Sequence, residues 1–150
     1  QLDVVFLSAT EVDLDFNVNC MTDSNGILMG ASGGHSDTAA GAKLAVIVVP
    51  LIRGRLPMIR DKVQTVITPG ESIDVIVTER GIAVNPKRAD LLEKLKGSNL
   101  PLYTIQELQQ MSYDLVGKPK DIEVSQDDKD IVAVVEYRDG SIIDLVRKPL

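Results

Sequence analysis

The sequence predicts an α/β fold, in which a mostly parallel sheet is flanked by helices and a C-terminal β-hairpin follows. Two observations lead to this prediction. Short runs of valine and isoleucine are bounded by Gly, Pro, Asn and Asp, which is typical of buried strands. A strand, a glycine-rich loop, a helix and a second strand also follow one another in the first third of the chain, as in a βα unit.

Four runs are predicted to form strands: residues 4–8, 44–49, 63–68 and 74–78. The run at residues 44–49 shows no alternation of polar and apolar side chains, so we expect it to be covered on both faces, as in a parallel sheet. Residues 12–19 do alternate, which predicts a half-exposed strand or one arm of a hairpin.

Two helices are predicted in the middle of the chain. The first follows the glycine-rich loop over about residues 36–43, with Ser36 or Asp37 as its N-cap. The second covers residues 86–96, with Asn85 as its cap and a proline at its first position.

A third helix is predicted to begin at the capping box of Thr104 and Glu107 and to end before Gly117. Beyond it, two apolar runs flank Asp139-Gly140, which predicts a β-hairpin. We therefore expect an α/β domain over residues 1–117 and a C-terminal hairpin extension over residues 118–150.

The composition excludes several classes of function. The chain has 150 residues, the size of one domain, with 16 basic and 22 acidic residues and no Lys/Arg block, which argues against binding nucleic acid. Its longest apolar run is too short to span a membrane, and no signal peptide is visible at Gln1. The single cysteine, Cys20, cannot form an internal disulfide, which favours a reducing, cytoplasmic location.

The strongest local motif is GASGGHSD, which contains Gly33 and Gly34. Consecutive glycines let another molecule approach the main chain closely, and the loop precedes a predicted helix. Its free N–H groups suit an anion or a developing oxyanion. A tight turn without any ligand explains the same residues about equally well, and the spacing is not that of a dinucleotide fingerprint.

His35 is the only histidine, so no histidine-based metal cluster can form within this chain. An ordinary loop histidine is a better explanation than a general base. Cys20 is most simply a small buried hydrophobic residue, although a Cys-His nucleophile pair is conceivable.

Charged residues follow two of the predicted strands. Arg53 and Arg55 come just after the strand at residues 44–49, and Glu79 follows the strand at residues 74–78. Ligands of open parallel sheets bind beyond the carboxyl ends of the strands, where two guanidinium groups could hold carboxylates. Solvated surface charges are the alternative for all three residues.

Three motifs in order, GASGGHSD, PLIRGRLP and TPGESIDVIVTERGIAVNP, resemble the C-terminal half of citrate lyase alpha chains. These are citrate:acyl-carrier-protein transferases within the family I CoA-transferases. The resemblance extends from about Glu11 to about Tyr113 without a large gap.

The resemblance implies a citrate CoA-transferase. A glutamate attacks the acyl thioester, and the reaction passes through mixed anhydrides and a glutamyl thioester. The thiol then passes to citrate, acetate leaves, and a separate beta chain cleaves the citryl thioester. The implied partners are citrate, the acyl carrier (gamma) subunit with its phosphoribosyl-dephospho-CoA arm, the beta subunit and further copies of the chain. The resemblance implies no cofactor bound covalently by this chain.

The resemblance also implies roles for single residues. Gly34 matches the position whose N–H faces the oxyanion, Gly33 supports the turn, and Glu79 lies beside the nucleophile. Arg53 and Arg55, because of their position after a strand, and His35 are the candidates for substrate binding. Glu11 matches a different, strand-borne glutamate. In relatives the nucleophile lies before the segment that matches Glu11, so the resemblance implies a nucleophile upstream of Gln1.

Two other functions are compatible with the same residues. An acetyl-CoA hydrolase or transferase would use free CoA in place of the carrier. A binding or subunit-contact domain could have kept the fold without catalysis. Turnover with carrier thioesters compared with free CoA thioesters would distinguish the first possibility, and binding of citrate or carrier without any transfer would indicate the second.

Overall fold

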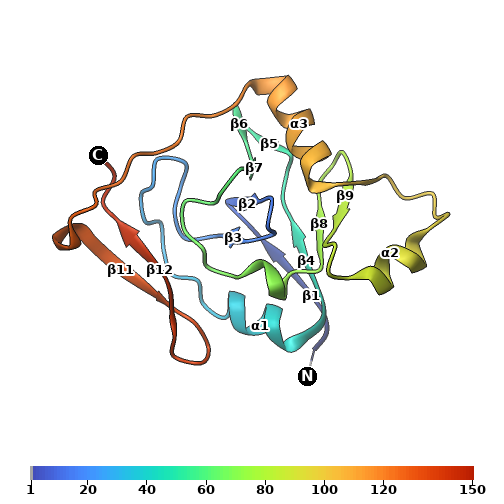
Figure 1. The fold of residues 1–150 in the computed structure, drawn as a ribbon, viewed down its shortest axis with the longest axis horizontal. Helices are drawn as coiled ribbons and strands as arrows, with labels where there is room; N and C mark the ends of the chain where they lie inside the picture. The colour runs from blue at the N-terminus through green and yellow to red at the C-terminus, as the bar shows by residue number, and fades with distance from the viewer. Residues whose placement is uncertain (1) are drawn as a thin grey trace.

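A five-stranded sheet organises the computed structural model, which describes residues 2–150 (Figure 1). Its strands lie in the order β1 (Leu2–Ser8), β4 (Ala42–Val48), β8 (Val75–Val77), β9 (Ile82–Val84) and β10 (Leu102–Tyr103). β1, β4 and β8 are parallel, whereas β9 is antiparallel to β8 and pairs in parallel with β10. The α/β class predicted from the sequence is confirmed.

Helices cover both faces of this sheet. The elements are α1 (His35–Gly41), α2 (Ala89–Leu95), α3 (Ile105–Val116) and the short 3-10 turns η1 (Gly70–Ser72) and η2 (Asp128–Asp130). α1 and α3 contribute to the larger apolar cluster, through Ala39 and Leu108 among others. Leu91 and Leu95 of α2 pack on a second cluster around Val46, on the other face.

The first two helices begin at other residues than predicted. α1 begins at His35, and its N-cap residue is Gly34. Ser36 and Asp37 lie inside the helix, so neither of them caps it. α2 begins only at Ala89. The side-chain amide of Asn85 donates instead to the carbonyl oxygens of Gly70 and Ile73, at 2.9 and 2.8 Å, and residues 85–88 form a turn.

The third helix forms as predicted. Thr104 and Glu107 make the reciprocal capping box, and the helix ends at Val116. Gly117 follows with a φ of 83°, a left-handed value that favours glycine.

The predicted strand over residues 63–68 is wrong. Backbone N–H groups in this segment donate to carboxylates rather than to a neighbouring strand: that of Gln64 to Glu11 and that of Val66 to Asp144, at 2.5 and 2.6 Å. Only an isolated bridge from Thr68 to Val18 remains. Carboxylates from distant parts of the chain therefore replace the strand pairing that the apolar residues suggested.

Small strands complete the fold beside α3. They are β2 (Glu11–Asp13), β3 (Val18–Asn19), β5 (Ile52–Arg53), β6 (Leu56–Pro57) and β7 (Ile59–Arg60). Residues 12–19 form both arms of a tight hairpin, β2 and β3, rather than one. They are also more buried than expected, because β2 pairs with β7 on its other side and Val12 and Val18 belong to the core.

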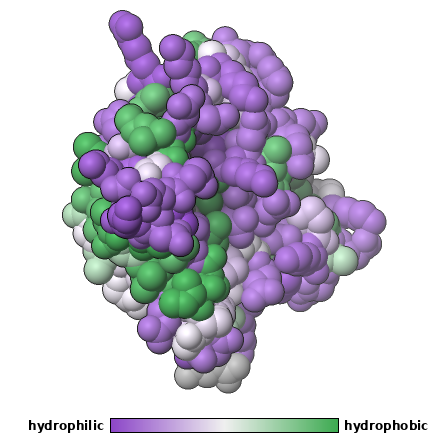
Figure 2. Space-filling model, turned by 60° about the vertical axis from the view of Figure 1, so that its left-hand side comes forward, coloured by the Kyte–Doolittle hydropathy of each residue, from purple (hydrophilic) through white to green (hydrophobic). Residues whose placement is uncertain are grey.

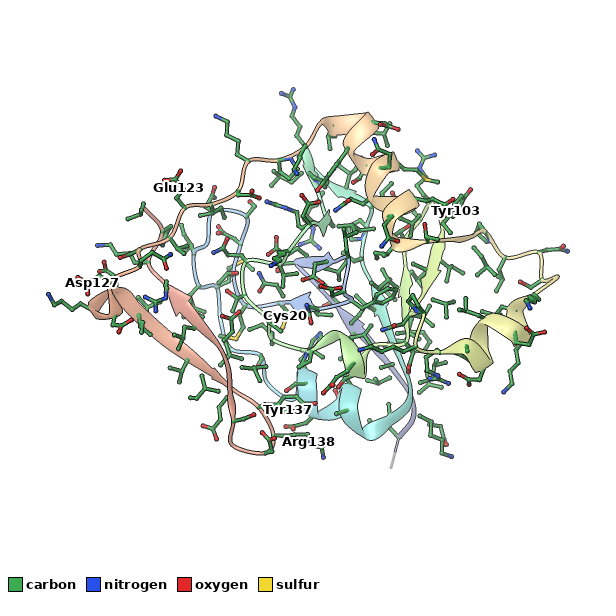
Figure 3. The ribbon with its side chains drawn as sticks, viewed as in Figure 1. Cys20, Tyr103, Glu123, Asp127, Tyr137 and Arg138 are labelled. Carbon is green, nitrogen blue, oxygen red and sulfur yellow. The ribbon has the colours of Figure 1, made fainter. Side chains whose placement is uncertain are left out.

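The C-terminal hairpin is confirmed as β11 (Ile131–Glu136) and β12 (Ile142–Arg147). Val135 and Val146 pack against Ile67, and Cys20 joins this cluster. Cys20, labelled in Figure 3, is half-buried, and burial raises the pKa of its thiol. The hairpin thus packs directly on the residues before it, and the boundary proposed at residue 118 stays a prediction.

The outer face of the hairpin is apolar. Val132, Val134 and Ile142 are exposed there, and Figure 2 shows hydrophobic side chains gathered on this side of the molecule. Within residues 2–150 no helix is both long and apolar enough to cross a membrane.

Candidate functional site

The glycine-rich loop lies at the carboxyl ends of the parallel strands. The last residue of α1 directly precedes the first residue of β4. The first residues of α1 therefore lie at the opposite end of the strands, where β1 ends. The imidazole of His35, the first residue of α1, contacts the carbonyl oxygen of Ser8, the last residue of β1, at 3.0 Å. Gly33 and Gly34 therefore lie at the carboxyl ends of the strands, where open parallel sheets bind their ligands.

Gly33 and Gly34 present an open stretch of backbone. Both residues are exposed, and Gly33 has a φ of 55°, which side chains rarely allow. A Cβ atom built on Gly33 would meet nothing within 4 Å, and one on Gly34 would meet only Cγ2 of Thr38 at 3.9 Å. The N–H groups of both glycines donate no hydrogen bond to other groups of residues 2–150. Their lack of side chains is therefore not needed for packing and leaves room for a ligand.

His35 is held by the protein on both sides of its ring. Nδ1 lies 2.7 Å from Oγ1 of Thr68, and Nε2 lies 3.0 Å from the carbonyl oxygen of Ser8. A carbonyl can only accept, so Nε2 carries the proton and Nδ1 accepts from Thr68. Burial lowers the pKa of this imidazole, and the bond to Ser8 opposes that shift. A direct contact between His35 and substrate would require one of these bonds to break.

Glu79 is held at the same end of the sheet, beyond the carboxyl end of a strand. It follows β8, and its Oε2 accepts a hydrogen bond from the backbone N–H of Leu51 at 2.9 Å. The turn that carries it is fixed by Oγ1 of Thr78, which accepts from the N–H groups of Arg80 and Gly81. The carboxylate remains exposed, so it is positioned and accessible to another group.

The structure separates the two arginines that the sequence paired. Both are exposed on the β5–β6 hairpin, which turns at Gly54. Nη2 of Arg53 donates to the carbonyl oxygen of Ala9 at 3.5 Å, and its side chain lines a cavity, whereas Arg55 does not line it. Arg53 is consequently the better placed of the two for a carboxylate ligand.

This cavity, of about 230 Å³, extends from the end of β1 to the segment before the glycine-rich loop. It is lined by Thr10, Glu11, Thr22, Asp23, Ser24, Met29, Arg53, Leu56, Met58 and Arg60. Arg60, which the sequence reading missed, is buried there beside Glu11, with 3.8 Å between Nη1 and Oε2. A signal was available, because an arginine inside the otherwise apolar run at residues 56–60 needs a partner.

Glu11 is held by protein groups. Its Oε1 accepts from the side-chain amide of Asn19 at 3.0 Å and from the N–H of Gln64 at 2.5 Å. The carboxylate is buried, and Arg60 balances its charge. This geometry is that of a structural carboxylate, and the interpretation that Glu11 is not a nucleophile stays a prediction.

The described part of the chain, residues 2–150, contains no group of three or more His, Cys, Asp or Glu side chains that could hold a metal ion. The site contains a pair of open glycines, an exposed carboxylate and a guanidinium at the carboxyl ends of the strands. These groups suit a reaction in which carboxylates and a negatively charged intermediate are handled.

Comparison with known proteins gives one consistent family. The family model for the alpha subunit of citrate lyase (CitF) matches residues 1–149. The citrate lyase alpha chain of Klebsiella pneumoniae is 59% identical over 148 residues, which cover 99% of this chain and 28% of the relative. That of Haemophilus influenzae is 54% identical over 146 residues, covering 97% of this chain and 29% of the relative. The chain thus spans less than a third of these relatives.

A solved structure agrees with the sequence comparisons. The alpha subunit of citrate lyase from Streptococcus mutans, solved in complex with citrate, is 55% identical and superposes with a TM-score of 0.94. The match covers 100% of this chain and 29% of that one. The family model and these relatives agree over nearly every residue: the chain belongs to the family of citrate lyase alpha subunits.

Proposed function

We propose that this chain is part of a citrate CoA-transferase, which exchanges acetyl for citryl on the thiol of an acyl carrier protein. The observation that carries the proposal is the open Gly33-Gly34 backbone, which His35 holds against the carboxyl end of β1. Glu79 and Arg53 lie near the same end of the sheet, at the carboxyl ends of the strands. The Streptococcus mutans relative was solved with citrate, which supports citrate as the carboxylate substrate.

In the proposed reaction, a glutamate from outside this segment attacks the carbonyl carbon of the acetyl thioester. The carbonyl oxygen becomes an oxyanion, which the N–H of Gly34 stabilises. Collapse releases the carrier thiolate and leaves an acetyl-glutamyl anhydride. The thiolate attacks the glutamyl carbon, acetate leaves, and a glutamyl thioester remains. A carboxylate of citrate then attacks that thioester, and the released thiolate attacks the citryl carbon of the new anhydride, which restores the glutamate.

Glu79 and Arg53 have supporting roles in this proposal. The exposed carboxylate of Glu79, positioned by the N–H of Leu51, holds the nucleophile or the thioester arm by hydrogen bonding. Arg53 pairs with a carboxylate of citrate at the mouth of the cavity of about 230 Å³. Arg55 and His35 are weaker candidates for substrate contact, because Arg55 lies off the cavity and the His35 ring is already bonded on both sides.

The proposed partners follow from the reaction. An acyl carrier subunit delivers the acetyl group on a phosphoribosyl-dephospho-CoA arm, and a beta subunit cleaves the citryl thioester. The chain itself holds no covalent cofactor in this scheme, assembles with further copies of itself and works in the cytoplasm.

The test is turnover by the full-length alpha chain. Acetyl carrier protein and acetyl-CoA are offered separately with citrate, and the citryl thioester formed is measured. We expect the carrier thioester to give the higher kcat/KM. Preference for free CoA, or hydrolysis without transfer, would indicate an acetyl-CoA hydrolase or transferase. Binding of citrate without any transfer would indicate a non-catalytic domain.

A further inference from the structure

Part of one face of the five-stranded sheet, around β1, is not covered by any element among the described residues of this segment. Residues paired across parallel strands lie on the same face, and the register places Val4 beside Leu44 and Phe6 beside Val46. Val46 is buried under α2 together with Val75 and Val84. Val4 and Phe6, one strand further out, are 45% and 70% exposed. The cover provided by α2 therefore reaches Val46 of β4 but does not extend to β1.

Four apolar side chains form this uncovered region, which we call the β1 face: Leu2, Val4, Phe6 and Val48. Val5 and Leu7, the intervening residues of β1, point to the opposite face and pack on the main core. β1 is thus a strand with apolar residues on both faces but a cover on one only. Strands of parallel sheets are normally buried on both faces.

The outer edge of β1 is also unpaired. β1 is the first strand of the sheet order, and β4 is the only strand that pairs with it among residues 2–150. An exposed edge with apolar side chains is a site for pairing with another strand, and folded proteins normally cover such edges. The free edge and the uncovered β1 face therefore lie on the same strand.

We propose that the part of the citrate lyase alpha chain outside this segment covers the β1 face and pairs with the edge of β1. This chain spans 28–29% of the length of its curated relatives, so most of an alpha chain lies outside it and is long enough to provide the cover. A covering segment of the same polypeptide needs no second molecule. It would also bring the rest of the chain beside Ser8, which contacts His35 next to the glycine-rich loop. The inference rests on the family membership and not on the exchange reaction.

Cysteine labelling in the full-length alpha chain tests this proposal. Phe6→Cys and, as a second variant, Val48→Cys are compared with Lys94→Cys, which lies on the exposed side of α2. We expect a maleimide to react about tenfold or more slowly at positions 6 and 48 than at position 94, at every protein concentration, because the cover belongs to the same chain. Activity is not part of the readout, so the result does not depend on the proposed reaction.

Each other outcome would overturn the proposal. Equal labelling rates at positions 6 and 94 would show that the β1 face is free. Protection that is lost on dilution would indicate a second copy of the chain, and protection only after the beta or acyl carrier subunit is added would indicate another subunit. Should the variants fail to fold, hydrogen exchange of β1 in the unaltered full-length chain decides the question. Fast exchange of its outward-pointing N–H groups would contradict the proposed strand pairing.

Discussion

The imidazole of His35 donates from Nε2 to the carbonyl oxygen of Ser8 at 3.0 Å. This bond joins the residue that follows the two open glycines to the last residue of β1. The other ring nitrogen accepts from Thr68, which is bridged to Val18 of β3. The buried ring thus connects three separate parts of the chain, and through them it fixes where the glycine-rich loop lies relative to the sheet.

Replacing Gly34 by Val should slow acyl exchange in the full-length enzyme by about 10² or more, the loss typical of one oxyanion donor. The φ of Gly34 is −91° and its surroundings are open, so valine can be accommodated in the fold but obstructs close approach to the N–H group. Steady-state turnover measures the effect. Gly30→Val is the control, because Gly30 is equally open and lies in the same loop. Normal turnover by a folded Gly34→Val enzyme would remove the assignment.

Glu79→Gln should lower the rate of exchange while acyl-enzyme still accumulates, since the amide keeps the shape of the side chain but loses the charge. Its bond from the N–H of Leu51 can be retained through the amide oxygen. Rapid-quench measurement of the acyl-enzyme, with Glu93→Gln on α2 as the control, separates this from a general loss of charge. Complete loss of acyl-enzyme would mean that Glu79 has a more direct part in the chemistry.

Arg53→Ala should raise the KM for citrate by roughly tenfold, the loss expected for one charge-assisted hydrogen bond, and should change the KM for the acyl carrier less. Arg55→Ala should have a smaller effect on citrate, because only Arg53 lines the cavity. Initial rates over both substrates provide the comparison. Equal increases in both KM values for Arg53→Ala would point to a structural role.

The stability of the protein should depend on pH through His35. Burial lowers the pKa of its imidazole below the ordinary value of 6.5, so the unfolded chain binds a proton more readily than the folded chain. The contribution of His35 to stability is therefore complete above pH 6.5 and is lost as the pH falls from there toward the lower, folded pKa. Urea unfolding at about pH 7.5 and about pH 5.5 should show a larger loss of unfolding free energy for the parent than for His35→Gln. An identical loss in both proteins would contradict this account.

Local patterns predicted the elements that local chemistry determines. The capping box at Thr104, the Asp139-Gly140 hairpin and the strands around Ala45 and Ile76 need only neighbouring residues to be recognised. The failure over residues 63–68 has a long-range cause, because the carboxylate that accepts from Val66 lies 78 positions away, in Asp144. No periodicity in a short window carries that information.

The same distinction applies to the site. Gly33 and Gly34 were identifiable as consecutive glycines before a predicted helix, and Glu79 and Arg53 because each follows a predicted strand. The buried position of His35 depends on Ser8 and Thr68, which are 27 and 33 positions away, and the pairing of Arg60 with Glu11 depends on β2 lying beside β7. Such contacts exist only once the sheet has assembled.

We expect this segment to supply the oxyanion site and the supporting carboxylate, and the covalent nucleophile to lie elsewhere in the alpha chain. The most direct measurement is to incubate the full-length chain with acetyl carrier protein, trap the glutamyl thioester by borohydride reduction and locate the reduced residue by peptide mass spectrometry. A glutamate outside these 150 residues should carry the modification, with Glu11 and Glu79 both unmodified. Finding the modification on Glu79 or Glu11 would contradict it.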